Sequence, residues 1–142
     1  MGKMIFVNLP VKDLKKSMAF FSKLGFKFNP QFTNDNAACM IIEENNSYAM
    51  LLVEKFFKGF LRGKEISDAK KTTEVLVSLS LGSREEVDMF VKAALSAGGK
   101  EARETQDYGW MYGRAIEDLD GHIWEVGYMD MSKMPAEMKA KG

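Results

Sequence analysis

The sequence has 142 residues, of which 46% are hydrophobic, enough to build the core of a single domain. Its 20 basic residues balance its 20 acidic residues, so bulk charge excludes nucleic acid and an anionic membrane surface as partners. No apolar run approaches the roughly 20 residues of a membrane span, and no signal stretch precedes the first strand, so we expect a cytoplasmic protein. The lone Cys39 excludes an internal disulfide and is expected to be a packed thiol.

The first half of the chain predicts a strand, a helix and three further strands. Residues 4–9 form an apolar strand pattern that ends at Pro10, because proline lacks the N–H that a central ladder needs. Asp13 is a suitable N-cap for a helix over 14–23, with apolar residues at helical spacing and Gly25 at its end. Three β-like runs, separated by turn residues, then follow at 26–28, 37–42 and 48–53.

The second half repeats this order. Residues 75–81 predict a strand, and Ser83 with Glu86 forms a capping-box pattern at the start of a helix that ends at Gly98 and Gly99. Three strand candidates follow at 100–105, 110–116 and 122–129, with a turn at 118–121 between the last two. The repeat predicts two βαβββ modules.

We expect one domain over 1–142, with module one at 4–54 and module two at 73–129. The connecting loop, 55–72, carries an aromatic cluster of Phe56, Phe57 and Phe60. Long loops often serve as lids or binding segments, although a short helix that packs these rings on the domain or across a dimer interface fits equally well. The polar tail, 130–142, predicts a loose helix or a frayed end.

The two ends of the chain carry motifs of a known superfamily. Residues 118–126, DLDGHIWEV, are similar to the closing hairpin signature D-P-D-G-x-x-x-E-[LIV], with Leu119 where proline is usual. Residues 11–21, VKDLKKSMAFF, and 24–26, LGF, are similar to the matching N-terminal signature V-x-D-[LM]-x-x-S-x-x-F-[YF] and L-G-F. The chain thus resembles the vicinal oxygen chelate superfamily, which includes glyoxalase I, bleomycin-resistance proteins and extradiol dioxygenases.

The resemblance implies an α+β fold in which two βαβββ modules curve mixed sheets around a cavity, commonly in a homodimer. It also implies a divalent metal held by the first and fourth strands of each module and acting as a Lewis acid. Glu125 stands at the family's glutamate position, and its alternation with Trp124 and Val126 predicts that it faces the concave side. Glu125 is therefore the candidate catalytic residue and metal ligand.

The other ligand positions that the resemblance implies carry poor metal donors. They fall at Phe6 or Asn8, at Leu51, and at Leu76, which shares its face with Glu74 and Ser78. A divalent metal needs three or four oxygen or nitrogen ligands, and the chain offers Glu125, Glu74 and Asn8. The one histidine, His122, is expected to point away from Glu125. We therefore expect no tightly bound cofactor, with a weakly held divalent metal ion as the alternative.

A second candidate region is the aromatic run before the closing hairpin. Tyr108, Trp110, Tyr112 and Arg114 alternate with Met111 and two glycines. If the aromatic side faces the cavity, it forms a stacking wall with one cation for an anionic group of a ligand. Otherwise that side is core or dimer contact, and Met111 lines the pocket instead. Periodicity identifies two faces but not which one is concave, so both alternatives stay open.

Two functions of different class fit these residues. The first is a protein that binds a small aromatic or amphipathic molecule in the sheet cavity without a complete metal site, as bleomycin-resistance relatives do. The second is a divergent metal-dependent lyase, similar to lactoylglutathione lyase, in which Glu125 helps to hold the ion and moves a proton. The sequence leaves open whether the protein is an enzyme, because one fold hosts many chemistries. Only the second function predicts loss of activity on chelation and in Glu125→Gln.

Overall fold

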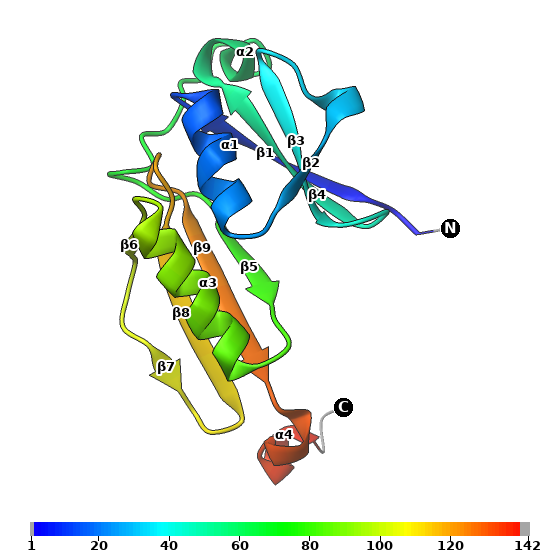
Figure 1. Ribbon diagram of the computed structural model, residues 1–142, viewed down its shortest axis with the longest axis vertical. Helices are drawn as coiled ribbons and strands as arrows, with labels where there is room; N and C mark the ends of the chain where they lie inside the picture. The colour runs from blue at the N-terminus through cyan, green and yellow to red at the C-terminus, as the bar shows by residue number, and fades with distance from the viewer. Residues whose placement is uncertain (1, 140–142) are drawn as a thin grey trace. The chain divides into compact units, whose positions relative to one another are not determined.

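A computed structural model describes residues 2–139 of the chain, and Figure 1 shows their helices and strands. The chain divides into two compact units, one up to Thr72 and one from Thr73 onward. Each unit has its own mixed sheet, with one parallel pair of strands and otherwise antiparallel pairs. The predicted fold class, α+β with two βαβββ modules and curved mixed sheets, is confirmed.

The first unit contains the predicted strand, helix and three strands, but the first strand continues through Pro10 to Val11, because it lies at the edge of the sheet, where proline is tolerated. Its elements are β1 (Ile5–Val11), α1 (Leu14–Lys23), β2 (Lys27–Asn29), the 3-10 helix η1 (Pro30–Phe32), β3 (Ala37–Glu43), β4 (Ser47–Val53) and α2 (Glu54–Lys58). The strands lie in the order β1-β4-β3-β2, with β1 parallel to β4. The short helix α2 contains Phe56 and Phe57, so the aromatic cluster of the connecting segment begins in a helix.

Helix α1 forms where the sequence predicts it. The side chain of Asp13 accepts a hydrogen bond from the backbone N–H of Lys16 at 3.1 Å, which satisfies one free donor of the first turn. Gly25 follows the helix with φ of +100°, a backbone conformation that residues with a Cβ rarely adopt. The apolar face of the helix buries Phe20 and Phe21 to 1% exposure against the sheet.

The second unit repeats this order of strand, helix and strands, with one additional strand and a C-terminal tail. Its elements are β5 (Leu76–Ser80), α3 (Arg84–Ser96), β6 (Lys100–Glu101), β7 (Gln106–Asp107), β8 (Met111–Glu117), β9 (Ile123–Met129), the 3-10 helix η2 (Met131–Lys133) and α4 (Ala136–Lys139). The strands lie in the order β5-β9-β8-β6, and β7 also pairs with β8. Strand β5 is parallel to β9, as β1 is to β4.

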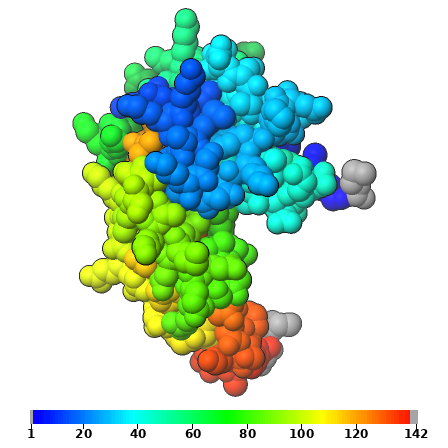
Figure 2. Space-filling model, viewed as in Figure 1, coloured from blue at the N-terminus to red at the C-terminus, as the bar shows by residue number. Residues whose placement is uncertain are grey.

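Helix α3 covers one face of the second sheet. Ser83 caps it through the N–H of Glu86, as predicted, while the Glu86 carboxylate accepts the N–H of Gly82 at 2.7 Å. Beneath the helix lie Trp124 and Ile116, both 0% exposed. On the face shown in Figure 2, the atoms of α3 hide most of β9, of which only small orange patches remain visible.

Two strand predictions in this unit are wrong in their bounds. The run 100–105 is not continuous, because the chain bends at Arg103 between β6 and β7. The strand predicted from Trp110 begins at Met111, because Gly109, with φ of +81°, places Trp110 in the turn that joins β7 to β8. In both places a local turn interrupts a pattern that reads as extended.

From Asp130 to Lys139 the described chain forms only short helical turns. The tail contains η2 and α4, in keeping with the predicted loose helix, and its last three residues lie outside the described part of the chain. None of the helices formed by residues 2–139 has the length and apolar character needed to cross a bilayer.

Candidate functional site

Glu125 lies in the middle of β9, between two fully buried side chains. Trp124 and Val126 are 0% and 1% exposed and pack on the side of the sheet that α3 covers. Strand alternation therefore turns Glu125 to the opposite face, as the sequence predicts. On that face its neighbours in register are Ser78 on β5 and Ala115 on β8.

Both carboxylate oxygens of Glu125 are engaged. The hydroxyl of Ser78 donates a hydrogen bond to Oε1, and Nη1 of Arg103 donates to Oε2 at 2.6 Å. The Ser78 hydrogen bond, followed by the Arg103 hydrogen bond and charge, lowers the pKa of Glu125 against the opposing effect of burial. Glu125 is therefore an ionised, paired carboxylate at neutral pH.

Arg103 is the candidate site residue that the sequence did not reveal. It lies at the bend between β6 and β7, in a run that reads as an ordinary strand and carries no family motif. Its Nε atom is buried and has no hydrogen-bond partner within residues 2–139, so the guanidinium keeps a spare donor beside the ion pair. Only the fold brings it across to β9.

Glu125 and Arg103 line one wall of a pocket of about 420 Å³ on the open face of the second sheet. The pocket has a polar end, where Ser78 accompanies the ion pair, a middle part, where Gln106 stands in register with Gly113, and an apolar end with two methionines. Its lining residues are Ser78, Leu79, Ser80, Arg103, Gln106, Met111, Tyr112, Gly113, Glu125, Val126, Gly127 and Met129.

The predicted metal ligands do not form a cluster with Glu125 in the second unit. Glu74 is exposed and precedes β5; it stands four positions before Ser78, which is about 13 Å in an extended chain. Asn8 belongs to β1 of the first unit. Across residues 2–139 no group of three or more His, Cys, Asp or Glu side chains is placed to hold a metal ion. With both Glu125 oxygens engaged and the Arg103 cation beside them, these residues do not fit a divalent metal.

The aromatic run before the hairpin is divided between two environments. Tyr112 and Arg114 turn to the α3 side of the sheet, where the Asp88 carboxylate accepts the Tyr112 hydroxyl at 2.6 Å and Arg114 Nη1 at 2.9 Å. Arg114 also pairs with Glu101. Met111 faces the Glu125 pocket instead. Met111 thus lies on the pocket face of the strand, although Tyr112 still borders the pocket, and ligand binding by Met111, Tyr112 and Arg114 stays a prediction.

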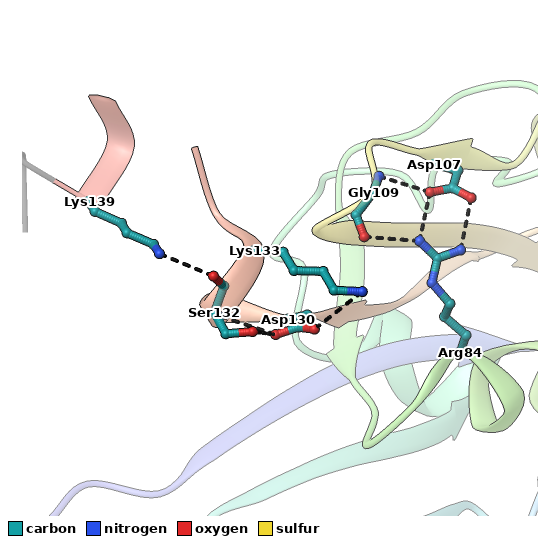
Figure 3. Close-up of polar contacts among 7 residues, drawn as sticks. All are labelled: Arg84, Asp107, Gly109, Asp130, Ser132, Lys133 and Lys139. Atoms are coloured by element: carbon teal, nitrogen blue, oxygen red, sulfur yellow. Dashed lines mark hydrogen bonds and ion pairs between the residues drawn. The ribbon is translucent and has the colours of Figure 1, made fainter. Parts of the chain in front are cut away.

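Tyr108 and Trp110 lie in the β7–β8 turn, which is linked to α3 by hydrogen bonds from Arg84. Both Nη atoms of Arg84 donate to the Asp107 carboxylate at 2.8 Å, and Nη2 also donates to the carbonyl of Gly109 at 3.0 Å (Figure 3). The Arg84 hydrogen bonds hold the pKa of Asp107 well below its usual range. Ligand binding by Tyr108 and Trp110 stays a prediction.

The acidic turn of the closing hairpin has a structural role. Asp118 is 6% exposed and accepts three hydrogen bonds: from the N–H groups of Asp120 and His122 and from the Trp124 indole N–H at 3.0 Å. Gly121, with φ of +94°, completes the turn. Burial raises the pKa of Asp118 despite these donors. The signature therefore fixes the hairpin that carries Glu125 rather than supplying a second ligand.

The first unit has a pocket at the corresponding place on its own sheet. Met50 pairs with Asn8 on β1 as Glu125 pairs with Ser78 on β5, and Asn8 and Ser78 stand at the same distance before the next helix. Met50, not Leu51, is therefore the counterpart of Glu125. Leu51 is fully buried on the helix side, because a shift of one residue changes the face.

The pocket of the first unit has a volume of about 650 Å³ and is uncharged. Part of its wall comes from the aromatic cluster, in which the rings of Phe56 and Phe60 meet edge to face with centroids 5.3 Å apart. The lining residues are Asn8, Gln31, Phe32, Asn34, Ala37, Met50, Leu52, Phe56, Phe57, Phe60 and Leu61. The connecting segment thus begins with a short helix that packs its rings on the first unit, as one of the two interpretations predicts, and a role as a lid or binding segment stays a prediction.

Comparison with known proteins agrees with this architecture. Residues 3–43 match the family described as bleomycin resistance protein-like N-terminal. The hypothetical protein SA1046 from S. aureus has a similar structure, with a TM-score of 0.73 and 30% sequence identity, over 90% of this chain and 95% of that one. No curated protein matches the chain.

Structures of lower identity share the fold. A glyoxalase/bleomycin resistance protein/dioxygenase family enzyme from Burkholderia phytofirmans PsJN has a TM-score of 0.73 at 16% identity, over 87% of this chain and 96% of that one. Lactoylglutathione lyase from Agrobacterium tumefaciens has a TM-score of 0.64 at 12% identity, over 94% and 98%. The chain belongs to the vicinal oxygen chelate superfamily, as its two terminal motifs predict.

Proposed function

We propose that the protein binds a small molecule in the pocket of the second unit, against Glu125, without a divalent metal. The ion pair between Glu125 and Arg103 supports this proposal most strongly. A guanidinium within 2.6 Å of the carboxylate supplies the positive charge that a metal would otherwise supply. The pair offers a ligand both a hydrogen-bond acceptor and donors while remaining neutral overall.

The exposure of the ion pair and the composition of the pocket walls support the binding of a small molecule. Side-chain exposures of 24% for Glu125 and 35% for Arg103 leave the ion pair accessible from the pocket. The walls combine these few polar groups with apolar surface, which is the usual composition of small-molecule sites. Each polar group can therefore orient a ligand that the apolar walls desolvate.

A metal-dependent lyase is the second candidate. The lowered pKa of Glu125 favours it, because a metal ligand must be ionised. In this alternative the Arg103 side chain would have to leave Glu125 before the ion could bind. We regard the neighbouring cation as the stronger observation. The homodimer that the superfamily suggests and the cytoplasmic location that we propose belong to either candidate.

Metal titration separates the two candidates. We would measure the metal content of the purified protein and then titrate nickel, zinc, manganese and iron(II) into chelator-treated protein by calorimetry. The variants are Glu125→Gln, Arg103→Met and, as a matched carboxylate-to-amide control, Glu74→Gln.

We expect no stoichiometric binding to the unaltered protein or to Glu74→Gln. Binding of one metal ion per chain that is lost in Glu125→Gln would overturn the proposal and establish the lyase-like site. Binding that arises only in Arg103→Met would support it, because removal of the resident cation would then have exposed the carboxylate. Sedimentation analysis of the same samples tests the homodimer.

A further inference from the structure

Two glycines lie side by side on the floor of the Glu125 pocket, at its middle. Gly113 on β8 and Gly127 on β9 are paired in register and both line the pocket. On one side of this pair lies Glu125, and on the other side Met111 and Met129 are paired in the same way. Between the ion pair and the methionines, the floor is therefore bare backbone at these two positions, with Ser80 and Gln106 in register on either side.

The backbone does not require glycine at either position. Neither residue has a positive φ. A Cβ added to Gly113 would meet no atom within 4 Å, and one added to Gly127 would meet only the Tyr112 carbonyl oxygen at 3.4 Å, an ordinary contact. Glycine weakens a strand relative to residues with side chains, and in strands it often marks the close approach of a ligand.

The fold does not require glycine there either, and the first unit supplies the comparison. Its corresponding pair on β3 and β4 is Ala37 and Leu52, which stand in register two positions from Met50 as the glycines stand two positions from Glu125. The corresponding sheet of the first unit thus accepts side chains at this pair of positions. Both pairs of positions lie beneath a pocket, and only the pocket of the second unit lacks side chains there.

We propose that this glycine floor accepts the flat face of a planar ring system whose polar edge meets the Glu125 and Arg103 pair. This inference rests on the proposed function and names its ligand class. The ion pair is neutral and offers a donor and an acceptor side by side, which matches an uncharged carboxamide-like edge. The thioethers of Met111 and Met129 suit the far edge of an aromatic ring.

The length of the floor sets the size of the ligand. Glu125 and Met129 are four positions apart on one strand, which corresponds to about 13 Å. Two fused rings with a carboxamide fit this span. The class is therefore an uncharged, planar, bicyclic aromatic amide.

The probe is 2-naphthamide, titrated into the full-length protein and followed by amide chemical shifts in NMR. Three comparison probes keep the two-ring carbon skeleton: 2-naphthoate is an anion, 2-(aminomethyl)naphthalene is a cation that lacks the carbonyl, and decahydronaphthalene-2-carboxamide is neither planar nor aromatic. We expect 2-naphthamide to shift the amides of Ser78, Arg103 and Glu125, and to bind about tenfold more tightly than each of the other three.

The floor itself is tested by Gly113→Ala, Gly113→Val and Gly127→Val. We expect a graded loss of 2-naphthamide affinity, small for Ala and about tenfold or more for Val, with an unchanged or raised Tm because the strand gains a side chain. Gly127→Val serves as the second variant should Gly113→Val lower the Tm.

The outcomes distinguish this inference from the function on which it rests. If the probes shift the pocket amides but the valine variants bind 2-naphthamide equally well, the planar floor is wrong and the binding site stands. Equal affinity for the non-planar amide leads to the same conclusion. If none of the four probes shifts these amides at millimolar concentration, the proposed binding function at this pocket fails as well.

Discussion

Glu125 is held between a hydroxyl and a guanidinium, and this pairing explains why a carboxylate can stay ionised on a partly covered strand face. The Ser78 hydrogen bond contributes most to its lowered pKa, followed by Arg103, while burial acts in the opposite direction. Removing only one partner of such a pair leaves a charge without compensation. The residue at the family's glutamate position is thus stabilised by this chain's own cation.

Glu125→Gln should reduce the free energy of unfolding in a pH-dependent way. A carboxylate whose pKa in the folded state lies below its usual value of 4.5 stabilises the fold above that value and loses this effect as the pH falls through the folded-state pKa. We expect the variant to be about 1 kcal/mol less stable at pH 7, a low figure because the solvent screens the partly exposed Arg103. Urea unfolding at pH 7 and pH 3.5 measures the difference, which should shrink at the lower pH.

Glu104→Gln is the matched control, because Glu104 is exposed on the neighbouring loop. It should leave the free energy of unfolding unchanged at both pH values. A Glu125→Gln difference that persists undiminished at pH 3.5 would mean that the effect comes from packing rather than from charge.

At the scale of the element, the β8–β9 hairpin determines where Glu125 points. Asp118 accepts two backbone N–H groups of the turn and the indole N–H of Trp124, so one carboxylate links the turn to the buried anchor of β9. Trp124 then fixes the register and the face of the strand. The orientation of the site residue follows from a bond network that lies on the other side of the sheet.

Asp118→Ala should destabilise the protein by about 3 kcal/mol, since it leaves three donors without their acceptor, one of them on a fully buried ring. Asp118→Asn keeps one oxygen for the turn amides and should lose roughly half as much. Urea unfolding of the three proteins gives the comparison. Equal losses in the two variants would show that the charge, rather than the pattern of acceptors, holds the hairpin.

At the scale of the whole molecule, one topology is used twice with different chemistry. The first unit has an uncharged pocket lined by amides and phenylalanines, and the second has a pocket built on an ion pair and bare glycines. Each unit pairs its first and last strands within itself, so each sheet is complete in its own part of the chain. The segment that joins the units is largely exposed and contains no strand.

Brief trypsin digestion should therefore cut first in this joining segment. Arg62, Lys64, Lys70 and Lys71 are all exposed there, whereas cleavage within a sheet requires a strand to open. Mass spectrometry should show fragments that end or begin between residues 62 and 72 before any others. First cleavage at Arg103 instead would show that the β6–β7 bend opens more readily than the joining segment, and that the Glu125 ion pair is weak.

The repeat, both capped helices, the closing hairpin, the superfamily and the face of Glu125 could be predicted from the sequence alone. These features depend on local signals: residue spacing, caps at Asp13 and Ser83, and the alternation around Trp124. The match of Leu51 to the glutamate position was one residue off, because alternation gives two faces but no register between distant strands.

Only the tertiary structure decided what surrounds Glu125. Arg103 lies 22 positions before Glu125 in the chain and reaches it because the chain bends between two short strands, which no local pattern marks. Asp88 accepts hydrogen bonds from Tyr112 and Arg114 on the helix side of the sheet, and Met111 lies on the opposite face. Contacts between residues far apart in sequence depend on how the elements pack, so they arise only when the whole unit has folded.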